Sequence, residues 1–331
     1  MGCAMVDVFN NSQTLSRGWY FLARSKEVPR GRAITRELRG RRVAIYRGTD
    51  GRARALAARC PHLGANLGDG AVDGNDLRCS FHHWRFGERG VCDHIPMMDT
   101  IPGFARTHAY PVEERWGAVF VWNGEGAPAL PLPTLGSLRD EDLAVLHLPS
   151  QVLGSHPHIV TCNGLDIQHW GALHELEFAE EPKLDDGDPH RLALDLSFRV
   201  RGHNRFERVL RRLAGEIIRP RFTTWGANMA TVEGTAGPVR LYVLFTHRPT
   251  ADGHSASRTL LFMPRARGLA GDLGLHWARL PATMMVLLYL LRRDRRLLDN
   301  LEFRPRLVAP DRALGLFMDQ VNALGAWEAP G

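Results

Sequence analysis

Two short segments combine cysteine and histidine at spacings that suit a metal site. The first is Cys60-x-His62 and the second is Cys79-x-x-His82, with 16 residues between them. Each segment can present one thiolate and one imidazole, so together they offer two sulfur and two nitrogen ligands. Zinc accepts a Cys₂His₂ donor set. Zinc fingers, however, normally place both cysteines in one loop and both histidines in the other, whereas here each loop carries one of each.

A mixed donor set in each loop also suits a Rieske [2Fe-2S] cluster, in which two cysteines bind one iron and two histidines bind the other. The spacing therefore predicts that Cys60 and Cys79 hold one iron and that His62 and His82 hold its partner. Structural zinc is the alternative. Two neutral imidazoles in place of two thiolates leave the cluster less negative and raise its reduction potential. Such a cluster is suited to accept electrons from a reductase chain.

A third pattern, Asn163-x-x-Asp166-x-x-His169-x-x-x-x-His174, lies in the C-terminal half of the chain. On the helix that we expect around residues 163–174, the spacing of three places Asn163, Asp166 and His169 on one face. A lone histidine in such an apolar stretch is more often a satisfied core residue, but a second histidine and an aspartate indicate a metal site. Since the histidines lie about 140° apart on an ideal helix, we expect a distortion near Gly171.

With these motifs, the chain resembles the Rieske non-haem iron oxygenases over nearly its whole length. The residues that flank the two cluster segments agree with this resemblance: Gly64, Leu67 and Gly68 follow the first, and Trp84, Phe86 and Gly90 follow the second. One departure is His83, since the family usually has glycine after the second ligand histidine. Because His82 keeps the Cys-x-x-His spacing, we expect His82 to be the ligand and His83 to be a packing or hydrogen-bonding neighbour.

The resemblance implies a second metal, a mononuclear iron held by His169, His174 and a carboxylate, with open positions for O₂. Asp294 and Asp299 are the candidates for the carboxylate. At helical spacing, the neighbours of Asp294 are all leucines: Leu287, Leu290, Leu291, Leu297, Leu298 and Leu301. An unpaired carboxylate in an apolar stripe is costly unless it binds a metal. Asp299 shares its face with charged residues, so we expect Asp294 to be the ligand.

The same resemblance gives Asp166 a role in electron transfer. In the family, the matching aspartate lies between the first iron histidine and a Rieske histidine of a neighbouring subunit. It therefore implies that Asp166 accepts a hydrogen bond from His169 in its own subunit and from His82 of the next. This arrangement requires a head-to-tail assembly that closes into a ring, so we expect a homotrimer. The alternative for Asp166 is a residue that only caps or solvates the helix.

The elements expected around these motifs suggest two domains. Short strands separated by Gly, Asp and Asn predict an all-β Rieske [2Fe-2S] domain at residues 15–125. A stretch rich in Pro, Gly and Ala predicts a linker at 126–135. Strands that alternate with helices, including a long helix from Pro281 that stops before Pro305, predict an α+β catalytic domain at 136–331. We expect this domain to be helix-grip-like, with an antiparallel sheet. The expected strands are 19–23, 42–46, 54–58, 110–112, 119–122, 144–148, 192–200, 231–233, 240–246 and 259–263.

Composition narrows the class of protein. The chain has 331 residues, of which 44% are hydrophobic and 24% are charged, as in globular proteins. Five cysteines do not make a disulfide framework; we expect Cys92 and Cys162 to be small buried hydrophobes and leave Cys3 unassigned. The net charge of +6 comes from scattered arginines, so we expect no nucleic-acid partner. An acidic redox partner, or an arginine-biased composition, explains the charge as well.

The sequence predicts a cytoplasmic location. The N-terminal residues show no basic region followed by an apolar core, as a signal peptide would. The longest apolar run, 284–291, is far shorter than the roughly 20 residues that a membrane span needs. We therefore expect no membrane span.

The function expected from these features is that of the oxygenase component of a Rieske oxygenase, most similar to the monooxygenase-type members. The resemblance extends to steroid hydroxylases, demethylases and prodiginine-cyclising oxygenases. Apolar residues near the predicted iron ligands suggest a hydrophobic aromatic or polycyclic substrate: Leu165, Trp170, Leu173 and Phe178. Hydroxylation, demethylation and oxidative cyclisation all remain open.

The expected partners follow from what the sequence lacks. It has no glycine-rich dinucleotide motif and no second set of iron-sulfur cysteines, so NAD(P)H must act through a separate reductase, with or without a ferredoxin. Two other classes of protein remain as alternatives. One is an electron-transfer Rieske protein, and the other is a lipid-binding protein without oxygenase activity.

Overall fold

The computed structural model describes residues 7–136, 138–200, 215–236, 239–265 and 280–329, together with 208, 211, 212 and 268. The chain divides into two compact units. The small-sheet unit comprises Ser12–Leu130, Arg248–Gly253 and Ala326–Gly331, and the large-sheet unit comprises Met1–Asn11, Pro131–His247 and His254–Gly325. Residues 126–135, the predicted linker, have no helix or strand. The predicted domain bounds stay a prediction.

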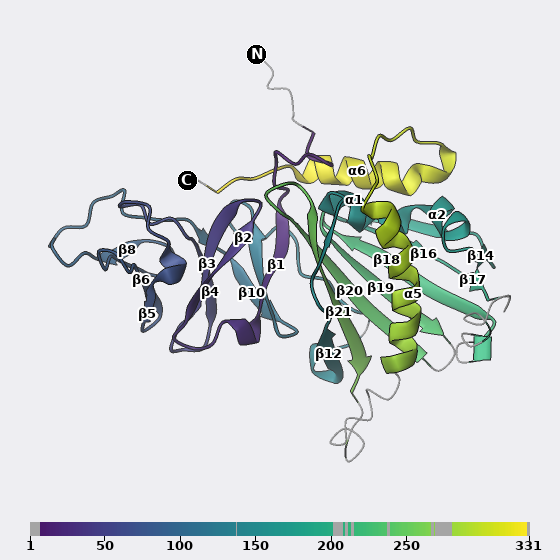
Figure 1. The fold of residues 1–331 in the computed structure, drawn as a ribbon, viewed down its shortest axis with the longest axis horizontal. Coiled ribbons are helices and arrows are strands. Elements are labelled where there is room, and N and C mark those ends of the chain that lie inside the picture. Colours follow the sequence, from purple (N-terminus) through teal and green to yellow (C-terminus); the bar gives the residue numbers. More distant parts are fainter. Residues whose placement is uncertain are drawn as a thin grey trace. The chain divides into compact units, whose positions relative to one another are not determined.

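The small-sheet unit contains three antiparallel sheets, in the orders β1-β11-β10, β2-β3-β4-β9 and β5-β6-β7-β8 (Figure 1). Their strands are β1 (Gly18–Arg24), β2 (Ala33–Leu38), β3 (Arg41–Arg47), β4 (Ala53–Ala57), β5 (Ala71–Asp73), β6 (Asp76–Arg78), β7 (Arg85–Phe86), β8 (Cys92–His94), β9 (Ala109–Tyr110), β10 (Val112–Arg115) and β11 (Ala118–Asn123). Two short 3₁₀ helices, η1 (Ser25–Glu27) and η2 (Leu67–Asp69), complete the unit.

Strand β3 separates two hydrophobic cores. Successive side chains of a strand point to opposite faces, and here Val43 and Ile45 pack into one core while Ala44 and Tyr46 pack into the other. The second of these cores also contains Cys60 and Cys79. The predicted cluster loops are therefore held on a fully packed β framework.

Several strands lie where the sequence predicts them, and the differences have local causes. The expected strand at 110–112 is divided into β9 and β10 at Pro111, which has no N–H to continue a ladder. Strand β2 was not predicted, because its polar residues Thr35, Arg36 and Glu37 give no apolar alternation. Strands β5 to β8 have only two or three residues each, too few to show a periodicity.

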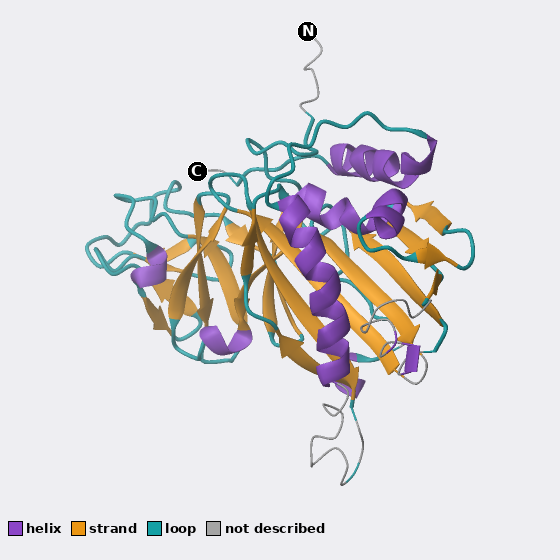
Figure 2. Cartoon of the chain, turned by 45° about the vertical axis from the view of Figure 1, so that its right-hand side comes forward, coloured by secondary structure: helices purple, strands orange, loops and turns teal. Residues whose placement is uncertain are grey.

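The large-sheet unit is built on a ten-stranded antiparallel sheet with the main order β12-β21-β20-β19-β18-β16-β15. Its strands are β12 (Leu143–His147), β13 (Gln151–Leu153), β14 (Glu177–Phe178), β15 (Lys183–Asp188), β16 (Arg191–Asp195), β17 (Phe198–Arg199), β18 (Ile217–Trp225), β19 (Met229–Ala236), β20 (Val239–Pro249) and β21 (Ser255–Pro264). The long helix α5 (Leu280–Leu298) crosses one face of this sheet (Figures 1 and 2). The predicted fold class, a β domain followed by an α+β domain with an antiparallel sheet, is confirmed.

The single helix that the sequence predicts around residues 163–174 is wrong. The structure has α1 (Pro157–Cys162), a 3₁₀ turn η4 (Asn163–Leu165) and a separate short helix α2 (Ile167–Ala172). Asp166 interrupts the helical path with extended backbone angles, φ −73° and ψ 100°, and caps α2. The predicted common face of Asn163, Asp166 and His169 therefore does not exist, because a carboxylate that caps a helix end favours a break over a continuous helix.

Three further differences concern the large-sheet unit. The expected strand at 192–200 is divided into β16 and β17, and β18 was not predicted. Helix α6 (Arg312–Leu324) directly follows the 3₁₀ turn η6 (Ala309–Asp311) and was also not predicted. A further 3₁₀ turn, η3 (Asp140–Asp142), precedes β12.

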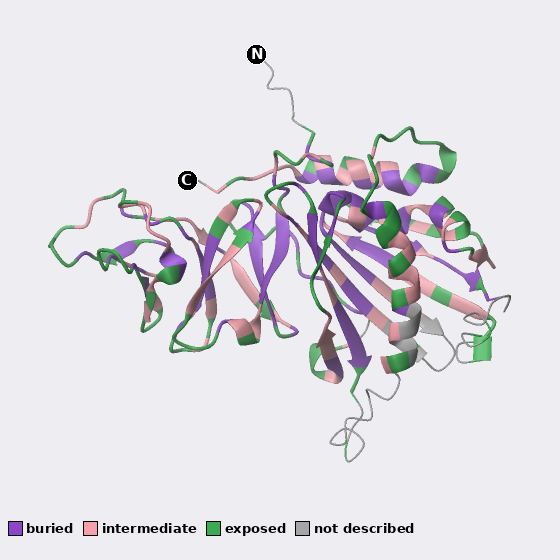
Figure 3. Cartoon of the chain, viewed as in Figure 1, coloured by how far each residue is buried: buried purple, intermediate pink, exposed green. Residues whose placement is uncertain are grey.

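Burial is concentrated in the strands of both units, while the connecting loops are mostly exposed (Figure 3). None of the helices in the described ranges has the length and apolar character needed to cross a membrane.

Candidate metal centres

Each predicted cluster segment forms a closed turn. In the first turn the Cys60 N–H donates to the Ala65 carbonyl at 2.8 Å, and in the second the Cys79 N–H donates to the Trp84 carbonyl at 2.8 Å. These backbone hydrogen bonds close each loop locally, and the core around Cys60 and Cys79 supports both loops. Each loop therefore presents its cysteine and its histidine in a fixed relation.

The four predicted cluster ligands meet as two pairs. Cys60 and Cys79 are buried and lie next to each other. Burial is the main reason that the pKa of Cys60 is raised to about 11, and the adjacent Cys79 thiol raises it further. The imidazole rings of His62 and His82 lie 4.5 Å apart, and the indole of Trp84 stacks on His62 at 4.5 Å. The sulfur atoms thus face one another, and so do the imidazoles.

This pairing fits a two-iron cluster. The Nδ1 atom of His62 is buried and has no hydrogen-bond partner in the described chain, which leaves a nitrogen available for a metal. Within the described residues, no three of the four ligands form a site for a single ion, as tetrahedral zinc would require. The separation of thiols from imidazoles is what a Rieske cluster needs. The assignment of the individual ligands stays a prediction.

His83, the residue that departs from the resembled pattern, is exposed and has φ +59°. Left-handed backbone of this kind favours glycine, which explains why glycine is usual at the position. The side chain of His83 points away from the core and is not needed to close the turn, whose hydrogen bond runs from the His83 N–H to the Cys79 carbonyl at 3.1 Å.

The second centre brings together His169, His174 and Asp294. Their ligand atoms all lie within 4.8 Å of one another, and this is the group in the described chain that could hold a single metal ion. His174 Nε2 is 3.0 Å from Asp294 Oδ1, and His169 Nε2 is 4.0 Å from the same oxygen. Both histidines are buried, and Asp294 is 14% exposed. The prediction of these three residues is confirmed.

Local contacts orient His169 toward that centre. The Nδ1 atom of His169 lies 2.6 Å from the backbone carbonyl of Asp166, so Nδ1 carries the proton and donates it. Nε2 is then unprotonated, and it is buried without a hydrogen-bond partner in the described residues. Burial above all lowers the pKa of His169, which favours the neutral imidazole that a metal binds. A buried, unpartnered Nε2 beside a carboxylate fits an iron ligand.

His174 reaches the same point because helix α2 ends before it. The Leu173 N–H and the His174 N–H both donate to the His169 carbonyl, at 2.8 and 3.3 Å, and Glu175 follows with φ +59°. The distortion expected near Gly171 lies in the turn that contains this residue: the His174 N–H bonds to a carbonyl five residues back, and helix α2 ends at Ala172. This widened last turn of the helix, in which one carbonyl accepts from two N–H groups, places the two imidazole rings 5.1 Å apart.

Asp166 contacts His169 differently from the prediction. Its carboxylate does not accept the imidazole proton, since the backbone carbonyl does so. Instead Oδ1 accepts from the N–H groups of Gln168 and His169, at 2.9 and 3.2 Å, and so caps α2. Oδ2 has no hydrogen-bond partner among the described residues. The role of Asp166 between subunits stays a prediction.

Comparisons with known proteins agree with this geometry. Residues 18–105 match the Rieske [2Fe-2S] domain family. Aminopyrrolnitrin oxygenase PrnD of Pseudomonas fluorescens is 35% identical over 188 residues, which cover 54% of this chain and 51% of PrnD. A probable 3-ketosteroid-9-alpha-monooxygenase oxygenase component of Rhodococcus rhodochrous is 33% identical over 174 residues, which cover 51% of this chain and 44% of the relative. The chain thus spans about half the length of these curated relatives.

Solved structures share the fold over most of the chain. Dicamba monooxygenase bound to 3,6-dichlorosalicylic acid has a TM-score of 0.66 at 18% identity, covering 94% of this chain and 98% of that one. NdmA of Pseudomonas putida CBB5 with caffeine has a TM-score of 0.68 at 13% identity, covering 94% of this chain and 95% of that one. Residues 18–105 therefore belong to the Rieske [2Fe-2S] domain family, and the chain as a whole is similar in fold to these oxygenases.

The chain has a cavity of about 140 Å³ beside the His169, His174 and Asp294 site. Asp294 and Trp170 border both the cavity and the site. Most of the lining is apolar and comes from the sheet and from α5, including Phe222, Val243, Phe245, Leu287, Leu290 and Leu291. Of the four residues expected to mark the substrate region, only Trp170 lines this cavity. Phe178 packs on Phe198 instead, and Leu165 and Leu173 are not among the lining residues.

A few polar residues interrupt the apolar lining, and apart from Asn163 and Asp294 they were missed from the sequence. His247 is buried and hydrogen-bonds through Nδ1 with the Ser257 hydroxyl at 2.8 Å, and burial lowers its pKa to about 3. Asn163, Gln151 and Thr259 add further polar groups. Because β20 and β21 lie side by side only in the folded sheet, no sequence spacing connects His247 with Ser257 and the iron ligands.

The residues that support the iron site were also missed. Arg293, on α5 beside Asp294, donates to the Leu173 carbonyl at 2.7 Å and pairs with Glu175 at 3.5 Å. These contacts hold the turn that carries His174. Gln168 of α2 donates to Asp311 at 2.7 Å. The charge run Arg292–Arg296 was the available signal, but it does not reveal which arginine faces inward.

Gly164 permits the close approach of the 3₁₀ turn η4 to the sheet. A Cβ at this position would lie 2.2 Å from the ring of Phe222, so only glycine fits. The Gly164 carbonyl accepts from the indole N–H of Trp170 at 3.1 Å. Trp170 is thereby fixed between His169 and the cavity.

Asp299, the other carboxylate considered for the iron, is exposed. Its Oδ1 accepts from the Gly154 N–H at 3.1 Å, and its Oδ2 pairs with Arg295 at 3.2 Å. These contacts fasten the loop after β13 to the end of α5. Asp299 therefore has a structural role away from the ligand set. Cys92 and Cys162 are buried as predicted, and Cys3 lies outside the described residues.

Proposed function

We propose that this chain is the oxygenase component of a monooxygenase-type Rieske system that oxidises a hydrophobic aromatic substrate with O₂. One observation carries the proposal: the triad His169, His174 and Asp294 borders a largely apolar cavity in the same unit. A two-histidine, one-carboxylate set leaves coordination positions open on iron. Bound there, iron would supply O₂ activation with electrons delivered through the cluster.

The chain's own residues would position the substrate and the ligands. His169 is held as the Nδ1–H tautomer by the Asp166 carbonyl, which turns Nε2 toward the metal. The leucines of α5 exclude water from one side of the cavity, and Phe222 and Val243 of the sheet exclude it from the other. His247 and Ser257 offer hydrogen-bonding groups, so a substrate with one polar substituent on an apolar ring fits the lining.

The size of the cavity bears on the substrate class. An engineered cavity of about 150 Å³ accommodates benzene, and the present volume is about 140 Å³. We therefore favour a substrate that places a single aromatic ring beside the iron. A polycyclic substrate would require side chains of the lining to move. Hydroxylation, demethylation and oxidative cyclisation are all compatible with this site.

Electrons would pass between subunits in a ring of three, as the family resemblance implies. The unpartnered Oδ2 of Asp166 is available to accept a hydrogen bond from His82 of a neighbouring subunit, and His82 is exposed. Asp166 would then hold His169 through its backbone carbonyl and His82 of the neighbouring subunit through its carboxylate. A separate NAD(P)H-dependent reductase, with or without a ferredoxin, would supply the electrons.

Product analysis tests the proposed function. The purified protein is supplied with a surrogate reductase, NADH, O₂ labelled with ¹⁸O and a panel of monocyclic and polycyclic aromatic compounds. We expect labelled product, or loss of a methyl group, from a monocyclic compound, and none from Asp294→Ala. Binding of panel compounds without oxidation by iron-loaded protein would favour a lipid-binding protein. If the cluster were reduced and reoxidised rapidly and no compound changed that rate, an electron carrier would be favoured.

A further inference from the structure

A groove of about 1320 Å³ in the small-sheet unit is lined by an unusual concentration of arginine. Its arginines are Arg41, Arg42, Arg52, Arg54, Arg59, Arg89 and Arg106, and Glu88 is the only carboxylate among its described lining residues. The triad and cavity of the other unit do not involve these residues. The sequence showed the arginines only as scattered, because they come together through the folding of β3, β4 and the loops around residues 89 and 106.

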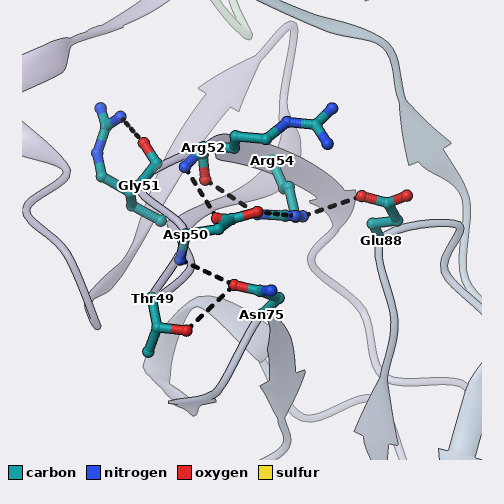
Figure 4. A network of polar contacts seen from close by, with 8 residues as sticks. Thr49, Asp50, Gly51, Arg52, Arg54, Asn75 and Glu88 are labelled. Atoms are coloured by element: carbon teal, nitrogen blue, oxygen red, sulfur yellow. Dashed lines mark hydrogen bonds and ion pairs between the residues drawn. The ribbon is translucent and has the colours of Figure 1, made fainter.

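Two of the seven arginines are neutralised by the protein itself. Arg54 is buried and binds Asp50 through two hydrogen bonds of 3.0 and 2.7 Å, and Glu88 at 3.2 Å (Figure 4). The Arg54 guanidinium holds the pKa of Asp50 well below its usual range. Arg41 pairs with Glu328. Because each of these two arginines is paired with a carboxylate, they add little net charge to the groove.

The five remaining arginines give the groove its charge. Arg42, Arg52, Arg59, Arg89 and Arg106 are exposed. None has a carboxylate partner in the described part of the chain. Figure 4 shows the Arg52 guanidinium extending away from the Asp50 carboxylate, which instead accepts from the Arg52 backbone N–H at 3.0 Å. Concentrated positive charge of this kind attracts an acidic partner and accelerates its association.

The groove also borders the predicted cluster. Pro61, between Cys60 and His62, is one of its lining residues. Phe104, which is 63% exposed, lines it as well and has its ring 6.2 Å from that of Trp84. Trp84 in turn stacks on His62. A partner seated on Phe104 would therefore lie one aromatic ring away from a predicted cluster ligand.

We propose that this groove is the docking site of an acidic iron-sulfur electron-donor protein, a proposal that rests on the proposed function. The donor would lose one electron and the cluster would gain one, with no bond made or broken. Exposed apolar residues within a charged rim, here Phe104 and the 43% exposed Val91, suit a weak and reversible protein interface. A nucleic acid is less well matched, because single strands require several exposed aromatic platforms and Phe104 is the one aromatic side chain with large exposure on this wall.

Binding and reduction can be measured separately with the intact, cluster-loaded protein. The probe is an acidic plant-type [2Fe-2S] ferredoxin, added oxidised for calorimetric binding and reduced for stopped-flow reduction of the cluster. Reduced methyl viologen, a small cation, serves as a reductant that does not need a basic surface. The test variants are Arg89→Glu and Arg106→Glu. The matched control is Arg30→Glu, since Arg30 is exposed in the same unit and does not line the groove.

We expect each test variant to weaken ferredoxin binding, and to slow reduction by ferredoxin, by at least about tenfold at low salt. Arg30→Glu should change either value by less than about twofold, and reduction by methyl viologen should be unchanged in every variant. The ferredoxin affinity of the unmodified protein should fall as salt is raised.

Equal effects of all three variants would overturn the proposal, because net charge rather than the groove would then decide binding. Tighter binding of a single-stranded oligonucleotide than of ferredoxin, lost in Arg106→Glu, would assign the groove to nucleic acid instead. A protein that binds ferredoxin through the groove but oxidises no substrate would leave this proposal standing while the proposed function fails. Slower reduction by methyl viologen in the test variants would show damage to the cluster rather than loss of docking.

Discussion

The two metal centres of this chain are built in opposite ways. The predicted cluster ligands all lie within residues 60–82, on two turns that their own backbone hydrogen bonds close. The iron ligands lie up to 125 positions apart, on helix α2, on the turn after it and on helix α5. A site made from local turns can be identified from residue spacing. A site assembled from distant elements depends on every contact that brings those elements together.

The supporting contacts reflect this difference. In the cluster loops, the backbone N–H groups of Cys60 and Cys79 donate hydrogen bonds to carbonyls of their own turns. At the iron site, Arg293 reaches from α5 to the turn that carries His174. The Ser155 hydroxyl donates to the Leu298 carbonyl, which fixes the start of α1 against α5. Changes far from the ligands should therefore disturb the iron site more than the cluster.

The largest expected effect is the separate loss of one centre. Asp294→Ala removes the ligand that α5 contributes, so the protein should lose its mononuclear iron and its turnover while keeping the cluster signal in electron paramagnetic resonance. Iron analysis and the spectrum of the reduced protein check this. Asp299→Ala, the matched control, should keep both centres. Inactivity of Asp299→Ala with retained activity of Asp294→Ala would reverse the ligand assignment.

The second prediction concerns the loss of the cluster with the iron site retained. Cys60→Ser should abolish the low-average g-value signal of a two-imidazole cluster, because a serine hydroxyl is a poor ligand for this centre. The triad should still bind one iron per chain, since no iron ligand comes from the small-sheet unit. A variant that lost both metals would contradict the independence of the two sites.

A smaller effect is expected at a residue that touches neither metal. Arg293→Gln removes the contact with the Leu173 carbonyl and the pairing with Glu175, so the His174 turn loosens. Iron affinity should fall by about tenfold, as for other residues that orient metal ligands. Competition with a chelator measures this. Arg292→Gln, an exposed neighbour, should leave the affinity unchanged, and equal losses in both variants would point to charge rather than position.

Acid should weaken the large-sheet unit through its buried histidines. Burial lowers the pKa of His156 to about 4, whereas an unfolded histidine titrates near 6.5. Between pH ~6.5 and pH ~4 the unfolded state binds more protons at His156 than the folded state does. The contribution of His156 to the free energy of unfolding is therefore fully present above pH ~6.5 and is lost as the pH falls toward 4. For His156 the loss amounts to roughly 3 kcal/mol. Urea unfolding at pH 7, 5.5 and 4 should show a shallower decline for His156→Gln, and an unchanged decline would refute this origin.

The smallest effect is expected in a cluster loop. His83→Gly relieves left-handed backbone and should raise the free energy of unfolding by about 0.5 kcal/mol, after the greater freedom of glycine in the unfolded chain is subtracted. The cluster signal should not change. Gly64→Ala, at φ +80°, should have the opposite sign. Loss of the signal in His83→Gly would show that His83 acts on the cluster after all.

Prediction from the sequence succeeded where neighbouring residues determine the structure. Strands β1, β3 and β11 follow from short runs of apolar residues that include aromatic or β-branched side chains and are bounded by turns. Asp294 could be selected over Asp299 because an isolated carboxylate among leucines needs a partner. Only part of that leucine stripe faces the cavity, however: Leu287 and Leu298 are buried, while Leu297 and Leu301 are 39% and 37% exposed.

By itself, then, the sequence determined the pairing of one cysteine with one histidine in each cluster loop, which depends on separations of a few positions. It also determined the candidate iron ligands and the fold class, because these follow from residue type and from the local pattern around each residue. The tertiary structure decided the rest. Asp166 ends one helical turn and caps the next, and the widened last turn of α2 brings His174 beside His169. His247 reaches Ser257, and seven arginines reach one groove, only through strand pairing. Contacts between residues far apart in the chain depend on how the sheets close, which local spacing does not encode.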